Sequence, residues 1–152
     1  MSAFDKYKDL LGLPYLEGTQ DCYGLLRQYY AINYGLSLRN YARPLDFADS
    51  FDLISKNFSS EGFIVLDVSL DRLQIGDGLL FRLNNKRFVN HVGAFVGNGY
   101  VLHHLYQRLS SIDALTQVWK NRVVSVVRHP EVVELNKGKD TLINFRVPNG
   151  FN

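Results

Sequence analysis

The sequence predicts an α+β fold in which N-terminal helices pack on a central antiparallel sheet. Two observations support this class. Apolar residues before residue 60 recur with helical spacing, whereas from Gly62 onward they form short β-branched and aromatic runs separated by glycine or asparagine turns. A chain whose helices come first and whose strands come later is typical of α+β proteins.

Three helices are predicted before residue 60. The first covers Phe4–Leu11 and the third covers Asp46–Asn57. The second has the clearest boundaries, because Asp21 suits the N-cap position and Gly35 suits the C-terminal stop of the apolar pattern between them. Cys22 therefore lies in the first turn of this helix.

Five strands and one more helix are predicted after Gly62. The sequence Gly97-Asn98-Gly99 is a hairpin signal between two of the strands, and Asp77 reads as a turn residue before another. The strands cover residues 63–68, 78–83, 89–96, 100–105 and 123–129, and a short helix capped by Ser111 runs to Trp119.

The length and composition suit one compact domain. Of the 152 residues, 46% are hydrophobic and 21% charged, which is ordinary for a globular protein with a sizeable core. We place the domain at residues 1–130 and a polar extension at residues 131–152, which either adds to the sheet or lies loose on the surface. The basic residues are scattered, so no nucleic-acid partner is expected. No stretch has the roughly 18 uncharged apolar residues of a membrane span, so no membrane insertion is expected.

Cys22 is the only cysteine, which excludes an internal disulfide and a multi-cysteine zinc site. Two interpretations remain. Free cysteines are among the most buried residues, so Cys22 can be a small core residue. Alternatively, the unpaired N–H groups and the dipole of a helix N-terminus favour the thiolate and supply an oxyanion donor. The second interpretation makes Cys22 a nucleophile.

A cysteine nucleophile needs a base and a group that orients the base. His91 begins one strand of the predicted hairpin, and His103 and His104 end the other. Because side chains alternate along a strand, the turn decides which histidine shares the face of His91. A three-residue loop pairs Gly93 with His103 and places His103 diagonal to His91, whereas a two-residue turn places His104 on that face. Taken singly, each histidine is more often a hydrogen-bonded structural residue.

The same side chains allow a metal alternative. One cysteine and two histidines can ligate zinc and leave a fourth position open. The usual close spacings of ligands are missing from the sequence, so no metal and no cofactor are expected.

Four segments share their order and spacing with a known family. They are Leu13–Gly18, Asp21–Leu26, Gly76–Phe81 and the stretch from His91-Val92-Gly93 through the glycine turn to His103. Together they resemble the NlpC-type cell-wall peptidases, a papain-like family of cysteine hydrolases, and they imply a papain-like fold.

This resemblance implies roles for four residues. Cys22 is the nucleophile, and His91 is its general base. His103 binds the far nitrogen of His91 and fixes its tautomer, while Tyr15 and the backbone N–H of Cys22 donate to the oxyanion. The implied reaction is hydrolysis of an amide in the peptide stem of peptidoglycan, in this family usually between D-glutamate and a diamino acid.

Tyr23, the run His103-His104-Leu105 and the pair Arg128-His129 are similar to a subgroup found in the tail assembly and tail-tip proteins of lambda-like long-tailed phages. The similarity implies synthesis in the host cytoplasm, a place at the distal tail of the virion, contacts with other tail-tip proteins and action at the host cell wall. Two rival functions stay open. One is a structural role in tail-tip assembly with an inactive or unexposed site, and the other is acyl transfer to an acceptor other than water.

Overall fold

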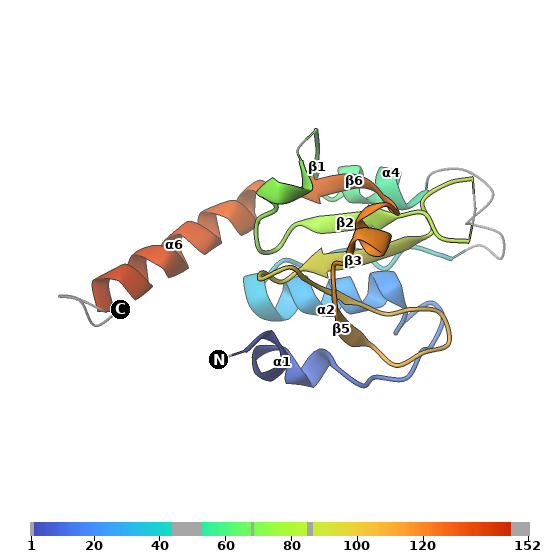
Figure 1. The fold of residues 1–152 in the computed structure, drawn as a ribbon, viewed down its shortest axis with the longest axis horizontal. Coiled ribbons are helices and arrows are strands. Elements are labelled where there is room, and N and C mark those ends of the chain that lie inside the picture. Colours follow the sequence, from blue (N-terminus) through green and yellow to red (C-terminus); the bar gives the residue numbers. More distant parts are fainter. Residues whose placement is uncertain (1, 44–52, 68, 85–86, 147–152) are drawn as a thin grey trace.

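The centre of the molecule is an antiparallel sheet. The computed structural model describes residues 2–43, 53–67, 69–84 and 87–146. Within these residues the sheet has six strands in the order β1-β6-β2-β3-β4-β5, and every neighbouring pair is antiparallel. Helix α2 lies along one face of the sheet, with α1 beside it (Figure 1). The predicted α+β class is confirmed.

The five predicted strands are present with shorter bounds, and one strand is additional. The strands are β1 (Ile64–Leu66), β2 (Gly78–Phe81), β3 (His91–Phe95), β4 (Tyr100–His103), β5 (Ser111–Ala114) and β6 (Val123–Arg128). The helices are α1 (Ala3–Lys6), α2 (Cys22–Tyr34), α4 (Leu53–Ser60), α5 (Gln117–Lys120) and α6 (Pro130–Arg146), with 3-10 turns at Lys8–Leu10 and Leu70–Arg72.

Helix α2 begins and ends where the sequence predicts. Asp21 Oδ1 accepts the N–H of Gly24 at 2.8 Å, which satisfies one of the unpaired donors of the first turn. Gly35 has a φ of 62°, and its N–H donates to the Ala31 carbonyl at 3.0 Å. Glycine adopts this left-handed conformation without steric cost, so it terminates the helix.

The two faces of the sheet bury different apolar clusters. The larger cluster lies between α2 and the face that carries Leu80, Val92 and Leu102. The smaller cluster lies on the opposite face and includes Leu79, Phe81, Val101, Leu115 and Val126, with Trp119 packed against it. The alternation of side chains along β2, β3 and β4 produces this division.

The helix predicted from Ser111 to Trp119 is wrong over its first half. Residues Ser111–Ala114 form β5 and pair with β4, and only Gln117–Lys120 are helical. Ser111 can cap a helix, but its hydroxyl instead donates to Asp113, while Ile112 is buried in the larger cluster. Pairing with β4 and burial of Ile112 outweigh a local capping preference.

Other boundaries also differ from prediction. The first helix is split at Tyr7 into α1 and the 3-10 turn, although Ser2 caps it as expected. The predicted helix Asp46–Asn57 lies partly outside the described residues, and its described part belongs to α4.

Of the segment after Pro130, the described residues as far as Arg146 form α6 and do not extend the sheet. The first turns of α6 dock on the body through buried Val132 and through Asn136, which donates to the Ile75 carbonyl at 2.7 Å. The helix then runs away from the sheet (Figure 1). Within the described ranges, none of the helices is both long enough and apolar enough to span a bilayer. The domain boundary near residue 130 stays a prediction.

Candidate active site

Cys22 is the first residue of α2 and contacts the strand that begins with His91. The residue is half-buried and packs against the larger apolar cluster. Its sulfur accepts hydrogen bonds from the backbone N–H groups of Val92 and Tyr23. Since Val92 directly follows His91 in β3, the candidate nucleophile and the candidate base meet at one strand end.

The thiol of Cys22 is harder to ionise than the sequence predicts. Burial and the negative charge of Asp21 raise its pKa to about 11, although the N–H groups of Val92 and Tyr23 and the charge of Arg43 act in the opposite direction. Desolvation disfavours the charged form of an acid and here outweighs the helix N-terminus. The expectation of a favoured thiolate is therefore corrected, and the resting group is a thiol.

The hairpin brings His91 and His103 together. Gly93 pairs with His103, so the loop Gly97-Asn98-Gly99 is the three-residue alternative and His103 shares the face of His91. Nε2 of His91 lies 2.9 Å from Nδ1 of His103, which is a hydrogen bond.

Gly93 is the residue that allows this close approach. A Cβ added to Gly93 would lie 2.6 Å from Cγ2 of Val101 and 3.2 Å from Cβ of His103. Any larger residue would therefore push β4 away from β3, and the two imidazoles would separate. Glycine at this position follows from the packing of the histidine pair.

His103 has a second partner that sequence reasoning missed. Its Nε2 lies 2.7 Å from Oδ2 of Asp113 in β5, and the Ser111 hydroxyl donates to the same oxygen at 2.8 Å. The incorrect helix prediction is the reason that Asp113 was missed, because a helix from Ser111 would not place the Asp113 side chain against β4. The alternation of Ser111, Ile112, Asp113 and Ala114 was the available signal for a strand.

Both imidazoles are neutral at neutral pH. Burial lowers the pKa of His91 well below its usual value, and the neighbouring His103 and His104 lower it further. Burial also lowers the pKa of His103, although Asp113 raises it in part. Burial raises the pKa of Asp113, but hydrogen bonds from His103 and Ser111 outweigh this and hold it below its ordinary value. Asp113 is therefore the charged member of the group.

Tyr15 lies beside the cysteine, and His104 packs against it. Burial and the neighbouring Cys22 raise the pKa of Tyr15, so its hydroxyl keeps its proton. The rings of Tyr15 and His104 are edge-to-face at 5.3 Å. His104 points away from the His91–His103 pair, and its Nε2 lies 2.8 Å from the Arg108 carbonyl.

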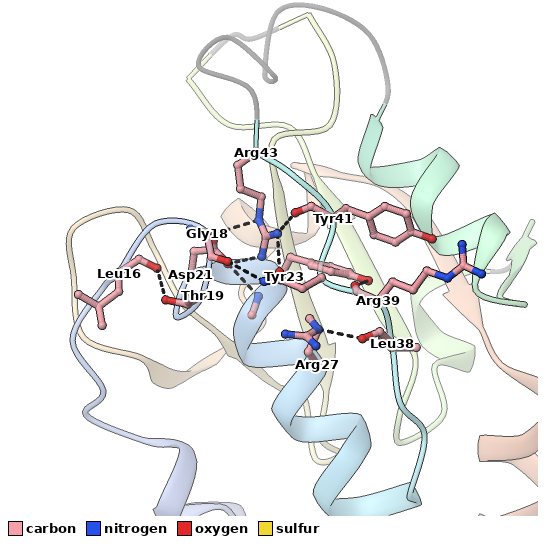
Figure 2. A network of polar contacts seen from close by, with 12 residues as sticks. Leu16, Gly18, Thr19, Asp21, Tyr23, Arg27, Leu38, Arg39, Tyr41 and Arg43 are labelled. Carbon is pink, nitrogen blue, oxygen red and sulfur yellow. Dashed lines mark hydrogen bonds and ion pairs between the residues drawn. The ribbon is translucent and has the colours of Figure 1, made fainter.

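Asp21 does more than cap α2. Its two carboxylate oxygens bind Nε and Nη2 of Arg43 at 3.1 and 3.0 Å, while Oδ2 also accepts the N–H of Gly18 at 2.9 Å (Figure 2). Burial raises the pKa of Asp21, but the hydrogen bonds from Arg43, Gly24 and Gly18 outweigh it and lower the pKa overall. The pair ties the start of α2 to the segment that follows the helix.

Two hollows flank Tyr15. One is lined by Tyr15, Cys22, Asp21 and Arg43 together with residues of α4. The other, of about 700 Å³, is lined by Pro14, Tyr15, Leu105, Gln107, Arg108, Leu109, Ser111 and Asp113. The cysteine and the acidic end of the histidine chain therefore open onto neighbouring hollows, with Tyr15 lining both.

The nucleophile and the imidazoles pack against different apolar clusters. Cys22 packs with the larger cluster, whereas His91 contacts Phe81 and His103 contacts Trp119 in the smaller one, at ring distances of 5.4 and 5.1 Å. In the part of the chain that the structure describes, no hydrogen bond joins the sulfur to either ring. The structure thus joins His91 to His103 directly and joins Cys22 to them only through Val92.

Among the described residues, no group of three or more histidine, cysteine or acidic side chains is arranged to hold a metal ion. Asp77 lies away from this site. It accepts the N–H of Gln74 at 2.8 Å and pairs with Arg128 at 2.7 Å, as a turn residue would.

Residues 12–128 match the NlpC/P60 family. The chain is 31% identical over 121 residues to tail tip assembly protein K of Escherichia phage lambda, covering 79% of this chain and 59% of that protein. The chain thus spans about three-fifths of the length of this relative.

Solved structures give the same fold. A family member from Bacillus cereus is 24% identical, with a TM-score of 0.58 over 83% of this chain and 38% of that one. The NlpC/p60 domain of the peptidoglycan hydrolase SagA is 18% identical, with a TM-score of 0.52 over 82% of this chain and 93% of that one. The family match covers most of the chain, including Cys22, His91, His103 and Asp113, and the chain therefore belongs to the NlpC/P60 family.

Proposed function

We propose that the chain is a cysteine peptidase that hydrolyses an amide bond in the peptide stem of peptidoglycan. Cys22 is the nucleophile, His91 the general base and His103 the group that orients it. The observation that carries this proposal is the hydrogen bond between Nε2 of His91 and Nδ1 of His103, beside the strand end that binds the cysteine sulfur. It leaves Nδ1 of His91 for the reaction.

The first half of the reaction forms an acyl-enzyme. The thiol of Cys22 transfers its proton to Nδ1 of His91 as the sulfur attacks the amide carbonyl. Proton transfer at the moment of attack suits a thiol whose pKa is raised to about 11. Hydrogen bonds of this kind often form only in the substrate complex, so their absence from the free protein is compatible with the mechanism.

The oxyanion receives two donors. The hydroxyl of Tyr15 stays protonated because its pKa is raised, and the backbone N–H of Cys22 is an unpaired donor of the first helical turn. Each donor of this type typically contributes about 3–4 kcal/mol to the transition state.

The second half releases both products. Imidazolium at His91 protonates the leaving amine, which departs as the carbonyl re-forms. A water molecule then gives a proton to His91 and attacks the thioester, and the acid product leaves as the thiol of Cys22 regains its proton. Cleavage between D-glutamate and a diamino acid is the finer form of this proposal.

We place this activity at the phage tail tip. The similarity to a tail tip assembly protein supports a virion location at the distal tail, with other tail-tip proteins as partners. The protein is then made in the host cytoplasm and acts on the host wall during genome entry.

The test uses purified peptidoglycan. Wild-type protein should clear the wall suspension and release stem peptides with new amino termini, while the Cys22→Ala and His91→Ala variants should not. His129→Gln is the matched control, because His129 packs on Phe63 away from the site. Unchanged clearing by Cys22→Ala refutes the peptidase proposal.

A structural role in tail assembly is the second candidate, and the name of the lambda relative favours it. Virion assembly with the Cys22→Ala variant separates the two functions. Normal tails with lost wall digestion support the peptidase, whereas failed tails with no digestion by the wild type support the assembly role. The remaining rival is acyl transfer. If an added amine receives the acyl group in place of water, the chain is an acyltransferase.

A further inference from the structure

A third residue extends the hydrogen-bonded histidine pair. Together the contacts restrict which nitrogen of each ring carries a proton. They run from His91 Nε2 to His103 Nδ1 at 2.9 Å, and from His103 Nε2 to Asp113 Oδ2 at 2.7 Å. A neutral imidazole has one donor nitrogen and one acceptor nitrogen, so each contact restricts the next.

We propose that Asp113 is a positioning residue that sets the tautomer of His91 through His103. An ionised carboxylate only accepts hydrogen bonds, so His103 Nε2 must carry the proton and donate to Asp113. His103 Nδ1 then has the lone pair and must accept from His91 Nε2. Neutral His91 consequently has its lone pair on Nδ1. This inference rests on the proposed function, in which that nitrogen takes the thiol proton.

The groups around Asp113 and His103 favour this assignment of protons over the reverse assignment. The Ser111 hydroxyl donates to the same Asp113 oxygen, which marks that oxygen as an acceptor. Trp119 packs edge-to-face on His103 at 5.1 Å and lies tilted against His91 at 6.4 Å. The side chain of Asp113 is 47% exposed, so its carboxylate stays solvated and ionised, whereas His103 is buried.

Asp113 also supplies charge during the reaction. Its carboxylate stabilises the pair when His91 becomes imidazolium, much as an acidic residue does in other triads. The titratable and charged groups around the pair are Asp113 of β5, His104 after β4, Cys22 of α2, and Arg122, which stacks on Trp119 at 5.3 Å. Of these, Asp113 is the one hydrogen-bonded to an imidazole of the pair.

The direct test is the tautomeric state of each ring. Nitrogen-15 NMR of the full chain, without substrate, should find the proton on Nε2 in both His91 and His103. The Asp113→Ala variant removes the acceptor, and we expect a mixture of tautomers in both rings. Asp113→Asn keeps the size and should give a smaller mixture. Asp71→Asn is the control, because it removes an exposed carboxylate that has no part in this series of hydrogen bonds. Both rings should keep their wild-type tautomers.

The second readout is wall digestion as a function of pH. Loss of Asp113 removes a group that raises the pKa of His103, so the acid limb of kcat/KM should move to lower pH while kcat falls. The fall should be smaller than the roughly 10²- to 10⁴-fold contribution of a general base, because His91 remains. Asp113→Glu should recover part of kcat, which a purely structural role would not predict.

Two results overturn the inference. One is a proton on Nδ1 of His91 in the wild type, and the other is an unchanged pair of tautomers in Asp113→Ala. Neither depends on enzyme activity. If Cys22→Ala still digests walls, the proposed function fails while the ring assignments remain readable and still decide the role of Asp113.

Discussion

The sulfur of Cys22 is bound by the backbone N–H of Val92, the residue that follows His91 in β3. This contact holds the thiol at the end of the strand that carries the base. It also lowers the pKa of the thiol, but burial raises that pKa more, to about 11. The resting cysteine and histidines are therefore neutral, and their reactivity depends on proton transfer from the thiol of Cys22.

The first prediction concerns alkylation of Cys22. The rate of reaction with iodoacetamide should rise with pH to a midpoint near 11, because only the thiolate reacts. The same protein unfolded in urea should show the ordinary thiol midpoint of about 8.5. Since the folded pKa lies above the unfolded one, wild type should also lose stability relative to Cys22→Ala as the pH rises through this window. A folded midpoint below 8.5 contradicts the burial effect.

The second prediction concerns Tyr15. Tyr15→Phe removes the proposed oxyanion donor, so kcat for wall digestion should fall about 10²- to 10³-fold while the thermal midpoint changes little. Tyr106→Phe is the matched control, because that ring packs on Tyr15 at 5.3 Å and is 65% exposed. Equal losses in the two variants would assign Tyr15 to packing.

The third prediction concerns the ion pair at the start of α2. The side chains of Asp21 and Arg43 are 3% and 10% exposed. Arg43→Gln should lower the free energy of unfolding by about 3 kcal/mol in urea titrations, because it leaves a buried carboxylate without its cation. Arg39→Gln is the control on a neighbouring exposed arginine.

A double variant identifies the cause of that loss. Asparagine also caps helices, so Asp21→Asn combined with Arg43→Gln should be less destabilised than Arg43→Gln alone. In wild type the pKa of Asp21 is lowered, so its stabilisation is present above the ordinary carboxyl pKa and is lost as the pH falls through the lowered value. Acid unfolding of Arg43→Gln should therefore begin at higher pH than in wild type.

The fourth prediction concerns two glycines. Gly93→Ala inserts a methyl group 2.6 Å from Val101 and should cost about 1–3 kcal/mol by overpacking, with a loss of wall digestion. Gly138→Ala in α6 meets no atom within 4 Å and should instead stabilise the protein by about 0.5–1 kcal/mol. Thermal unfolding measures both changes, and loss of stability in Gly138→Ala would show that α6 is not an ordinary helix there.

Local signals were sufficient for α2. Asp21 and Gly35 delimit a helix through their own side-chain and backbone preferences, which do not depend on the rest of the fold. For the histidine pair, strand alternation left His103 and His104 as alternatives, and the register of the three-residue loop places His103 beside His91.

The rest depends on contacts between distant residues. Ser111 has a capping preference, and only its pairing with β4 reveals a strand and the contact between Asp113 and His103. Arg43 pairs with Asp21 although the whole of α2 lies between them in the sequence, and no short motif indicates this contact. The pKa of Cys22 follows from burial, and burial becomes known only when the sheet is in place.

The division of the site between two apolar clusters has a consequence for partial unfolding. Phe81 and Trp119 support the imidazoles from the smaller cluster, whereas Tyr23 and Leu26 anchor the helix that bears the thiol in the larger one. A denaturant concentration that unfolds only the smaller cluster would leave Cys22 packed in the larger one, while His91 and His103 lose their contacts. Activity should then be lost at a lower denaturant concentration than the spectroscopic signal of the helices. The separation of the two midpoints would measure how independently the two clusters unfold.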